Sequence, residues 1–143
     1  MSEADDRVVA WGRITWQTLH RWAADPSSTA AIAARIVQWM KQSYPCARCR
    51  TNLAALTQDG RWKVPLDPVS MIWNLHNQVN QHLGKKQQDR AVLCQYLGRP
   101  WDRASVVPSV QPWYEALKQA LRSTGPIRHP RLHVCTEKTC AVR

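Results

Sequence analysis

Two cysteines separated by two residues, Cys46 and Cys49, are the side chains of this sequence best suited to redox chemistry. They follow Tyr44-Pro45, which breaks one helical pattern, and they open the next one. In the first turn of a helix, the helix dipole and the free backbone N–H groups stabilise a thiolate and lower the thiol pKa. The spacing therefore predicts a pair that cycles between dithiol and disulfide.

Two other kinds of site also use a C-x-x-C pair. A thioredoxin-type site requires the motif after a strand of a βαβ unit, and no such strand is indicated here. Half of a zinc site needs two further ligands. Candidate ligands stand near the C-terminus: His129, His133, Cys135 and Cys140. A basic zinc-binding or nucleic-acid-binding module is therefore the alternative to a redox enzyme.

The sequence WNLHNQVNQHLGK, residues 73–85, forms the second pattern. On a helix, Trp73, His76, Asn77 and Asn80 share one face, where Lys, Glu and Arg would be usual on a surface. Uncharged groups that stack and form directional hydrogen bonds suit a flat polar ring. The alternative interpretation is a partly buried polar network.

The sequence WGRITWQTLH, residues 11–20, forms the third pattern. Arg13, Trp16 and His20 share a stripe of the predicted helix and offer a charge for phosphate, a stacking plane and a hydrogen bond. Taken alone, such residues usually serve packing and the surface.

The segments that must position these residues show the periodicity of helices and not that of strands. The predicted helices cover about residues 9–24, 30–43, 46–56, 67–84 and 88–97. Short connections between four such helices predict an all-α, antiparallel four-helix bundle with a short fifth helix. We expect an N-terminal tail over residues 1–10, the bundle over residues 11–98 and a basic C-terminal extension over residues 99–143, with one helix between Pro112 and Ser123.

Composition limits the function classes further. The 143 residues are 44% hydrophobic and 21% charged, which fits one folded domain, and no apolar run reaches the ~18 residues of a membrane span. The acidic N-terminus predicts neither a secretory signal nor a transit peptide. Five cysteines without a secretory signal favour redox or metal chemistry over a disulfide scaffold.

Positive charge is concentrated toward the C-terminus. Residues 85–143 carry 11 basic and 4 acidic side chains, against 9 and 6 in residues 1–84. This excess suits an anionic partner or a solubilising surface.

The three patterns together resemble the Erv/ALR family of sulfhydryl oxidases, flavoproteins that make disulfide bonds. The resemblance rests on G-R-x-x-W-x-x-L-H at residues 12–20, Y-P-C-x-x-C at residues 44–49 and H-N-x-V-N-x-x-L-G-K at residues 76–85. It implies a helical bundle with FAD in its mouth and the oxidation of protein dithiols, with O2 as acceptor and H2O2 as product. It also implies a homodimer formed through the first two helices.

The resemblance also assigns roles to individual residues. The positions that match the family's flavin-contacting region are Gly12, Arg13, Trp16, His20, Tyr44, Cys49, His76, Asn77, Val79, Asn80, Leu83, Lys85 and Lys86. Cys49 matches the charge-transfer thiolate beside the flavin, and Cys46 matches the interchange thiol. Lys85 and Lys86 would face the cofactor's phosphates.

The remaining cysteines depart from the family pattern or extend it. Trp73 stands where many members carry a structural cysteine, so Cys94 lacks that partner and is expected to be a buried free thiol. Cys135 and Cys140 match a shuttle pair that carries electrons from substrate to the C-x-x-C; the alternative is an inert tail pair.

The resemblance also leads to expectations about binding partners and cellular location. We expect no metal, no membrane and no nucleic-acid partner. A compact oxidase of this kind is similar to members encoded by large DNA viruses, which implies the host cytoplasm or the virion. The mitochondrial intermembrane space is the alternative.

Overall fold

The computed structural model describes residues 3–102, 111–122, 133–135 and 140–142, and the side chains of residues 7–102 and 111–122. The α-helices of this part are α1 (Glu3–Ala24), α2 (Ala30–Ser43), α3 (Ala47–Leu56), α4 (Pro68–His82) and α5 (Gln111–Arg122). The short 3-10 helices are η1 (Arg61–Lys63) and η2 (Arg90–Tyr96), and the strands are β1 (His133–Cys135) and β2 (Cys140–Val142).

Local capping residues start two of the helices where the sequence predicts them. Thr29 Oγ1 accepts a hydrogen bond from the Ile32 N–H at 3.1 Å and begins α2. Asp67 Oδ2 accepts one from the Ser70 N–H at 3.0 Å and begins α4, with proline at the first helical position. Each cap satisfies a backbone donor that the first helical turn leaves without a partner.

The first helix is longer than predicted. It begins at Glu3 instead of near Val9, so residues 3–10 belong to α1 and not to a tail.

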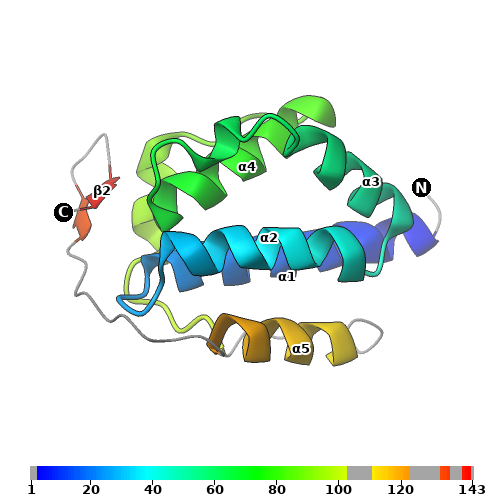
Figure 1. The fold of residues 1–143 in the computed structure, drawn as a ribbon, viewed down its shortest axis with the longest axis horizontal. Coiled ribbons are helices and arrows are strands. Elements are labelled where there is room, and N and C mark those ends of the chain that lie inside the picture. Colours follow the sequence, from blue (N-terminus) through cyan, green and yellow to red (C-terminus); the bar gives the residue numbers. More distant parts are fainter. Residues whose placement is uncertain (1–2, 103–110, 123–132, 136–139, 143) are drawn as a thin grey trace.

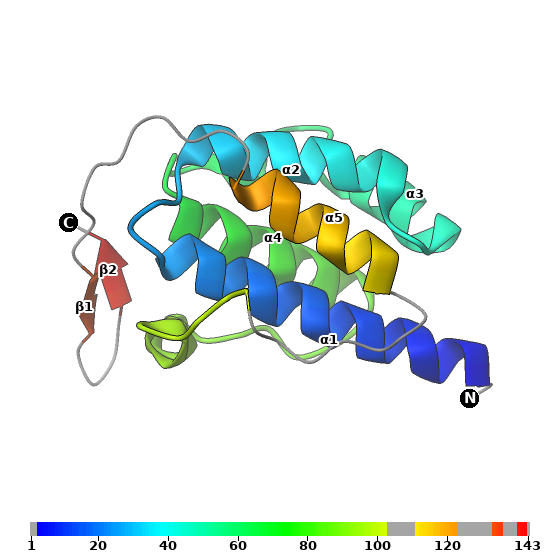
Figure 2. The same ribbon diagram turned by 90° about the horizontal axis from the view of Figure 1, so that it is seen from below.

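The helices enclose one apolar core. Helix α1 packs against α4, and α2 packs against α3, α4 and α5 (Figure 1). The most deeply buried side chains include Leu19, Trp22, Ile36, Met71, Ile72, Leu75 and Leu117. Seen from below, α5 lies across the face formed by α1 and α2 (Figure 2). The predicted helical fold class is confirmed, and the helix predicted between Pro112 and Ser123 is found as α5, which begins one residue before Pro112.

Two C-terminal elements differ from the prediction. The fifth helix is the 3-10 helix η2 and not an α-helix. Beyond α5, β1 and β2 pair in antiparallel register with Cys135 opposite Cys140, where no strand was predicted. Strand β2 lies against η2.

Candidate functional site

A disulfide joins Cys46 and Cys49 at the start of α3. Cys46 is the N-cap, and its Sγ accepts a hydrogen bond from the Cys49 N–H at 3.2 Å. Both side chains are partly buried against the core. The predicted placement in the first turn of a helix is confirmed. The sulfurs lie where backbone N–H groups and the helix dipole favour a thiolate after reduction.

Four aromatic side chains from three elements meet beside α4, and we call them the ring cluster: Trp16, His20, His76 and Tyr96. Trp16 stacks on His76 with ring centroids 4.2 Å apart and planes 5° from parallel. His20 stacks on Tyr96 at 4.8 Å. His20 Nε2 and His76 Nδ1 share a hydrogen bond of 2.9 Å. The structure therefore brings together the stacking residues of the second and third sequence patterns.

Both histidines of the ring cluster are held in the neutral form. Burial, and then the neighbouring His76, lower the pKa of His20 to about 3. Burial, and then the positive charge of Lys85, lower the pKa of His76 to about 4, while Gln88 acts in the opposite direction. At neutral pH one ring donates and the other accepts in their shared hydrogen bond.

The two asparagines of α4 bind the loop that follows the helix. Asn77 Nδ2 donates to the Gln88 carbonyl at 3.2 Å, and its Oδ1 accepts from the Gln88 N–H at 2.7 Å. Asn80 Nδ2 donates to the Lys86 carbonyl at 3.2 Å. These contacts are those of the partly buried polar network. They fix the loop that carries Lys85 and Lys86 beside the ring cluster.

Comparison with known proteins matches the chain to one family. The model of the Erv1 / Alr family matches residues 13–102. The chain belongs to this family. It is also similar to a protein of Invertebrate iridescent virus 3 named "Putative FAD-linked sulfhydryl oxidase 096R", with 29% identity in an alignment of 127 positions that covers 78% of this chain and 83% of that protein. No solved structure gave a match to the chain.

Erv1/Alr proteins bind FAD, and the residues of this structure fit that cofactor. Trp73 Nε1 is a buried polar atom without a hydrogen-bond partner among the described residues. Gln88 borders both His76 and Tyr96 of the ring cluster. An uncharged stacking surface with a polar atom in need of a partner suits a flat heteroaromatic ring. Exposed lysines on the adjacent loop suit a diphosphate.

Other residues assigned by the Erv1/Alr resemblance are spread around this centre. Arg13 on α1 is exposed, as are Leu83, Lys85 and Lys86 after α4. Gly12 and Val79 are partly buried. Tyr44 is buried at the end of α2. Helix α3, which begins at the disulfide, packs against α4, which carries His76.

Two residues of the site were not predicted from the sequence, Tyr96 and Gln88. Tyr96 was placed in the short fifth helix, but the periodicity of that segment does not show that the ring reaches His20. Gln88 lies two residues after the Gly-Lys-Lys segment. Its backbone N–H donates a hydrogen bond to Asn77 Oδ1, and this contact is visible only in the structure.

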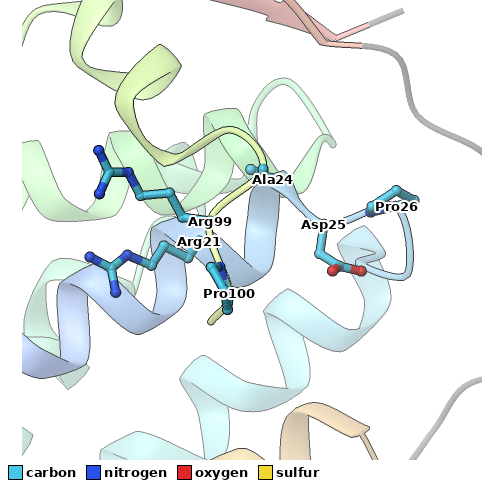
Figure 3. A pocket seen from close by; sticks show the side chains of 7 residues that line it. Arg21, Ala24, Asp25, Pro26, Arg99 and Pro100 are labelled. Atoms are coloured by element: carbon cyan, nitrogen blue, oxygen red, sulfur yellow. The ribbon is translucent and has the colours of Figure 1, made fainter. Parts of the chain in front are cut away.

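A small pocket of about 180 Å³ lies between the end of α1 and residues 98–100 (Figure 3). The side chains of Arg21 and Arg99 extend side by side there, away from Asp25. Because cofactor pockets usually measure about 300–1,000 Å³, this pocket does not hold a whole FAD. Its guanidinium groups add positive charge at the end of α1.

Cys94 corrects one prediction. It is disulfide-bonded and only partly buried, and so it is not a buried free thiol. The prediction assumed an apolar α-helical face, whereas the 3-10 turns of η2 leave this side chain partly open to solvent. The side chains of Cys135 and Cys140, the predicted shuttle pair, lie outside the described residues.

The sequence predicts neither a metal site nor a membrane span. No three His, Cys, Asp or Glu side chains within it gather as a metal site. The Cys46–Cys49 bond uses the two sulfurs that the zinc alternative needs as ligands. None of the described helices combines the length and apolar character required to cross a bilayer.

Proposed function

We propose that the protein is an FAD-linked sulfhydryl oxidase that forms disulfide bonds in protein substrates. The observation that carries this proposal is the redox-capable disulfide on α3, packed beside the helix that contributes His76 to the ring cluster. Membership of the Erv1/Alr family supports the same function.

Thiol–disulfide exchange at Cys46 begins the proposed reaction. A substrate thiolate attacks Cys46 Sγ, and Cys49 leaves as a thiolate that the first turn of α3 stabilises. The second substrate thiolate then attacks the mixed disulfide and releases Cys46. The substrate has lost two electrons and gained a disulfide, and the Cys46/Cys49 pair has become a dithiol.

The cofactor would be held by the ring cluster and the adjacent loop. Trp16, His20 and His76 would stack on it and form hydrogen bonds to it, and Lys85 and Lys86 would bind its phosphates. FAD, when bound, supplies an acceptor for the electron pair of the dithiol and a route from there to O2, giving H2O2.

The substitution Cys49→Ser tests this function. We expect the variant to keep its yellow flavin spectrum, because stacking and hydrogen bonding come from other residues. Dithiothreitol should no longer reduce that flavin under anaerobic conditions, whereas dithionite should still reduce it and so serve as the control. Thiol-driven oxygen consumption near the parental rate would rule out the assigned role of Cys49.

We further propose that Cys135 and Cys140 act as the shuttle pair; because Cys94 is disulfide-bonded, this role requires thiol–disulfide exchange that leaves both thiols free of Cys94 during turnover. Changing both to Ser should slow the oxidation of a folded protein dithiol much more than that of dithiothreitol, because only the large substrate needs an arm to reach Cys46. An equal effect on both reductants would contradict the shuttle.

The homodimer and the viral setting are proposals as well. The relative from an iridescent virus supports the host cytoplasm or the virion as the location. Helix α5 lies across α1 and α2, so a second copy would have to contact these helices beside α5 (Figure 2). Light scattering should give twice the 16.4 kDa of the chain, and a mass of one chain would contradict the homodimer.

A further inference from the structure

Helix α5 contacts the C-terminal end of α2 through one tryptophan, Trp113. The Trp113 ring stacks on Trp39 with centroids 5.6 Å apart and planes 7° from parallel. The same ring meets Tyr44 edge-on, at 4.8 Å and 87°. Its Nε1–H donates to Ser43 Oγ at 3.0 Å. We call Trp39, Tyr44 and Trp113 the indole cluster.

The helix that carries Trp113 is itself firmly attached to the bundle. Tyr114, Leu117 and Leu121 are each at most 3% exposed. The Tyr114 hydroxyl shares a buried hydrogen bond of 3.0 Å with Thr18 Oγ1 of α1. At the other end of α5, Arg122 pairs with Asp102 at 2.9 Å. Trp113 therefore fixes its neighbours relative to the core.

The neighbours of Trp113 lead directly into the disulfide. Ser43 is the last residue of α2, Tyr44 is its C-cap, and Cys46 follows two residues later. From the other side, Arg50 Nη1 of α3 donates to the Tyr44 carbonyl. The backbone before Cys46 is thus held between α5 and α3.

We propose that Trp113 is a positioning residue for the Cys46–Cys49 disulfide. It holds the approach to Cys46 so that, after reduction, the Cys46 thiol stays next to Cys49. Restricting the dithiol in this way favours closure of the ring, because less conformational freedom is lost when the S–S bond forms. The importance of this effect for catalysis rests on the proposed oxidase function. The equilibrium between the Cys46–Cys49 disulfide and its dithiol does not depend on that function.

Exchange with glutathione measures this equilibrium directly. Two glutathione thiols convert the Cys46–Cys49 disulfide into the dithiol and leave as one glutathione disulfide. The protein is equilibrated without oxygen over a range of glutathione ratios, and differential alkylation with peptide mass spectrometry gives the reduced fraction at Cys46 and Cys49.

Two single variants remove the same hydrogen bond from opposite sides. Trp113→Phe keeps an aromatic ring but loses the donor, and Ser43→Ala loses the acceptor. We expect each to raise the equilibrium constant for reduction three- to tenfold. At about 30 mV per tenfold change, the reduction potential of the disulfide would rise by about 14 to 30 mV. The double variant should shift no more than the larger single variant.

The matched control is Arg122→Gln, which breaks the ion pair at the far end of α5 and leaves the indole cluster intact. We expect its equilibrium to stay within twofold of the parent. Single variants that both stay within twofold of the parent would overturn the proposal. So would an Arg122→Gln shift as large as theirs, since α5 would then act only through general stability.

Failure of the positioning role and failure of the oxidase function give different results. The glutathione equilibrium needs neither bound FAD nor oxygen. A parent protein that oxidises no dithiol, with variants that still shift the equilibrium, would refute only the oxidase. Should Trp113→Phe not fold, Ser43→Ala with its Arg122→Gln control decides the question alone.

Discussion

The ring cluster and the indole cluster are both built from stacked aromatic side chains, but they differ in their polar atoms. In the ring cluster, His20 and His76 are kept neutral by burial, and Trp73 Nε1, on the same helix as His76, has no hydrogen-bond partner among the described residues. In the indole cluster, the Trp113 Nε1–H is satisfied by Ser43 Oγ, and the remaining contacts are ring on ring.

This difference separates a binding surface from a packing contact. Stacked rings occur in both clusters, so stacking alone does not mark a ligand site. A buried polar group without a partner is costly, and a ligand that satisfies it gains from that cost. By this criterion the ring cluster would bind the cofactor, whereas the indole cluster supports the helix end that leads to the disulfide.

The largest effect should come from the indole cluster, on stability and not on the cofactor. Trp39→Ala removes a half-buried ring that packs on Trp113. We expect the free energy of unfolding to fall by about 3 kcal/mol, measured by urea denaturation. FAD bound per folded molecule should not change. A variant that folds normally but loses its flavin would break the distinction between the two clusters.

A substitution in the ring cluster should cause a smaller free-energy change, and that change should appear in the affinity for the cofactor. Trp16→Ala removes the plane that stacks on His76. Stacking of a base on an aromatic side chain is worth about 1–3 kcal/mol, so FAD should dissociate roughly 30-fold more readily. Flavin fluorescence during dialysis measures the loss, with Trp39→Ala as the comparison. Equal flavin retention in the two variants would argue against the ring cluster as the binding surface.

Sequence reasoning reached the ring cluster more completely than the indole cluster for a physical reason. Caps such as Thr29 and Asp67 and the first-turn placement of Cys46 depend on neighbours within one helix, so local pattern predicts them. Trp16 and His76 each lie on a helix face that periodicity defines. Their partner Tyr96 depends on how η2 folds back on α1, which periodicity does not determine.

The contact of Trp113 with Tyr44 joins residues far apart in the chain, and the sequence predicts the helix around Trp113 but not the surface it covers. The pattern on α4 was ambiguous for another reason. Asn77 and Asn80 have the hydrogen-bonding groups for either a ligand or a polar network, and only the position of the following loop shows that they bind its backbone.

The smallest effect concerns pH, and it distinguishes the clusters by their charge. An unfolded histidine has a pKa near 6.5, whereas the folded values are about 3 for His20 and about 4 for His76. Between pH 4 and 6.5 the unfolded chain binds more protons, so folding stability rises with pH, is fully present above this range and is lost as the pH falls.

From pH 7 to pH 6, each of these histidines should cost about 0.7 kcal/mol of unfolding free energy. His76→Gln should therefore reduce the loss over this step by about that amount, as measured by urea denaturation at the two pH values. Trp39→Ala in the indole cluster should keep the parental loss, because it removes no titratable group. If His76→Gln kept the full loss as well, His76 would be protonated about equally in the folded and unfolded chain. The neutral, hydrogen-bonded histidine pair that sets the ring cluster apart would then not exist in solution.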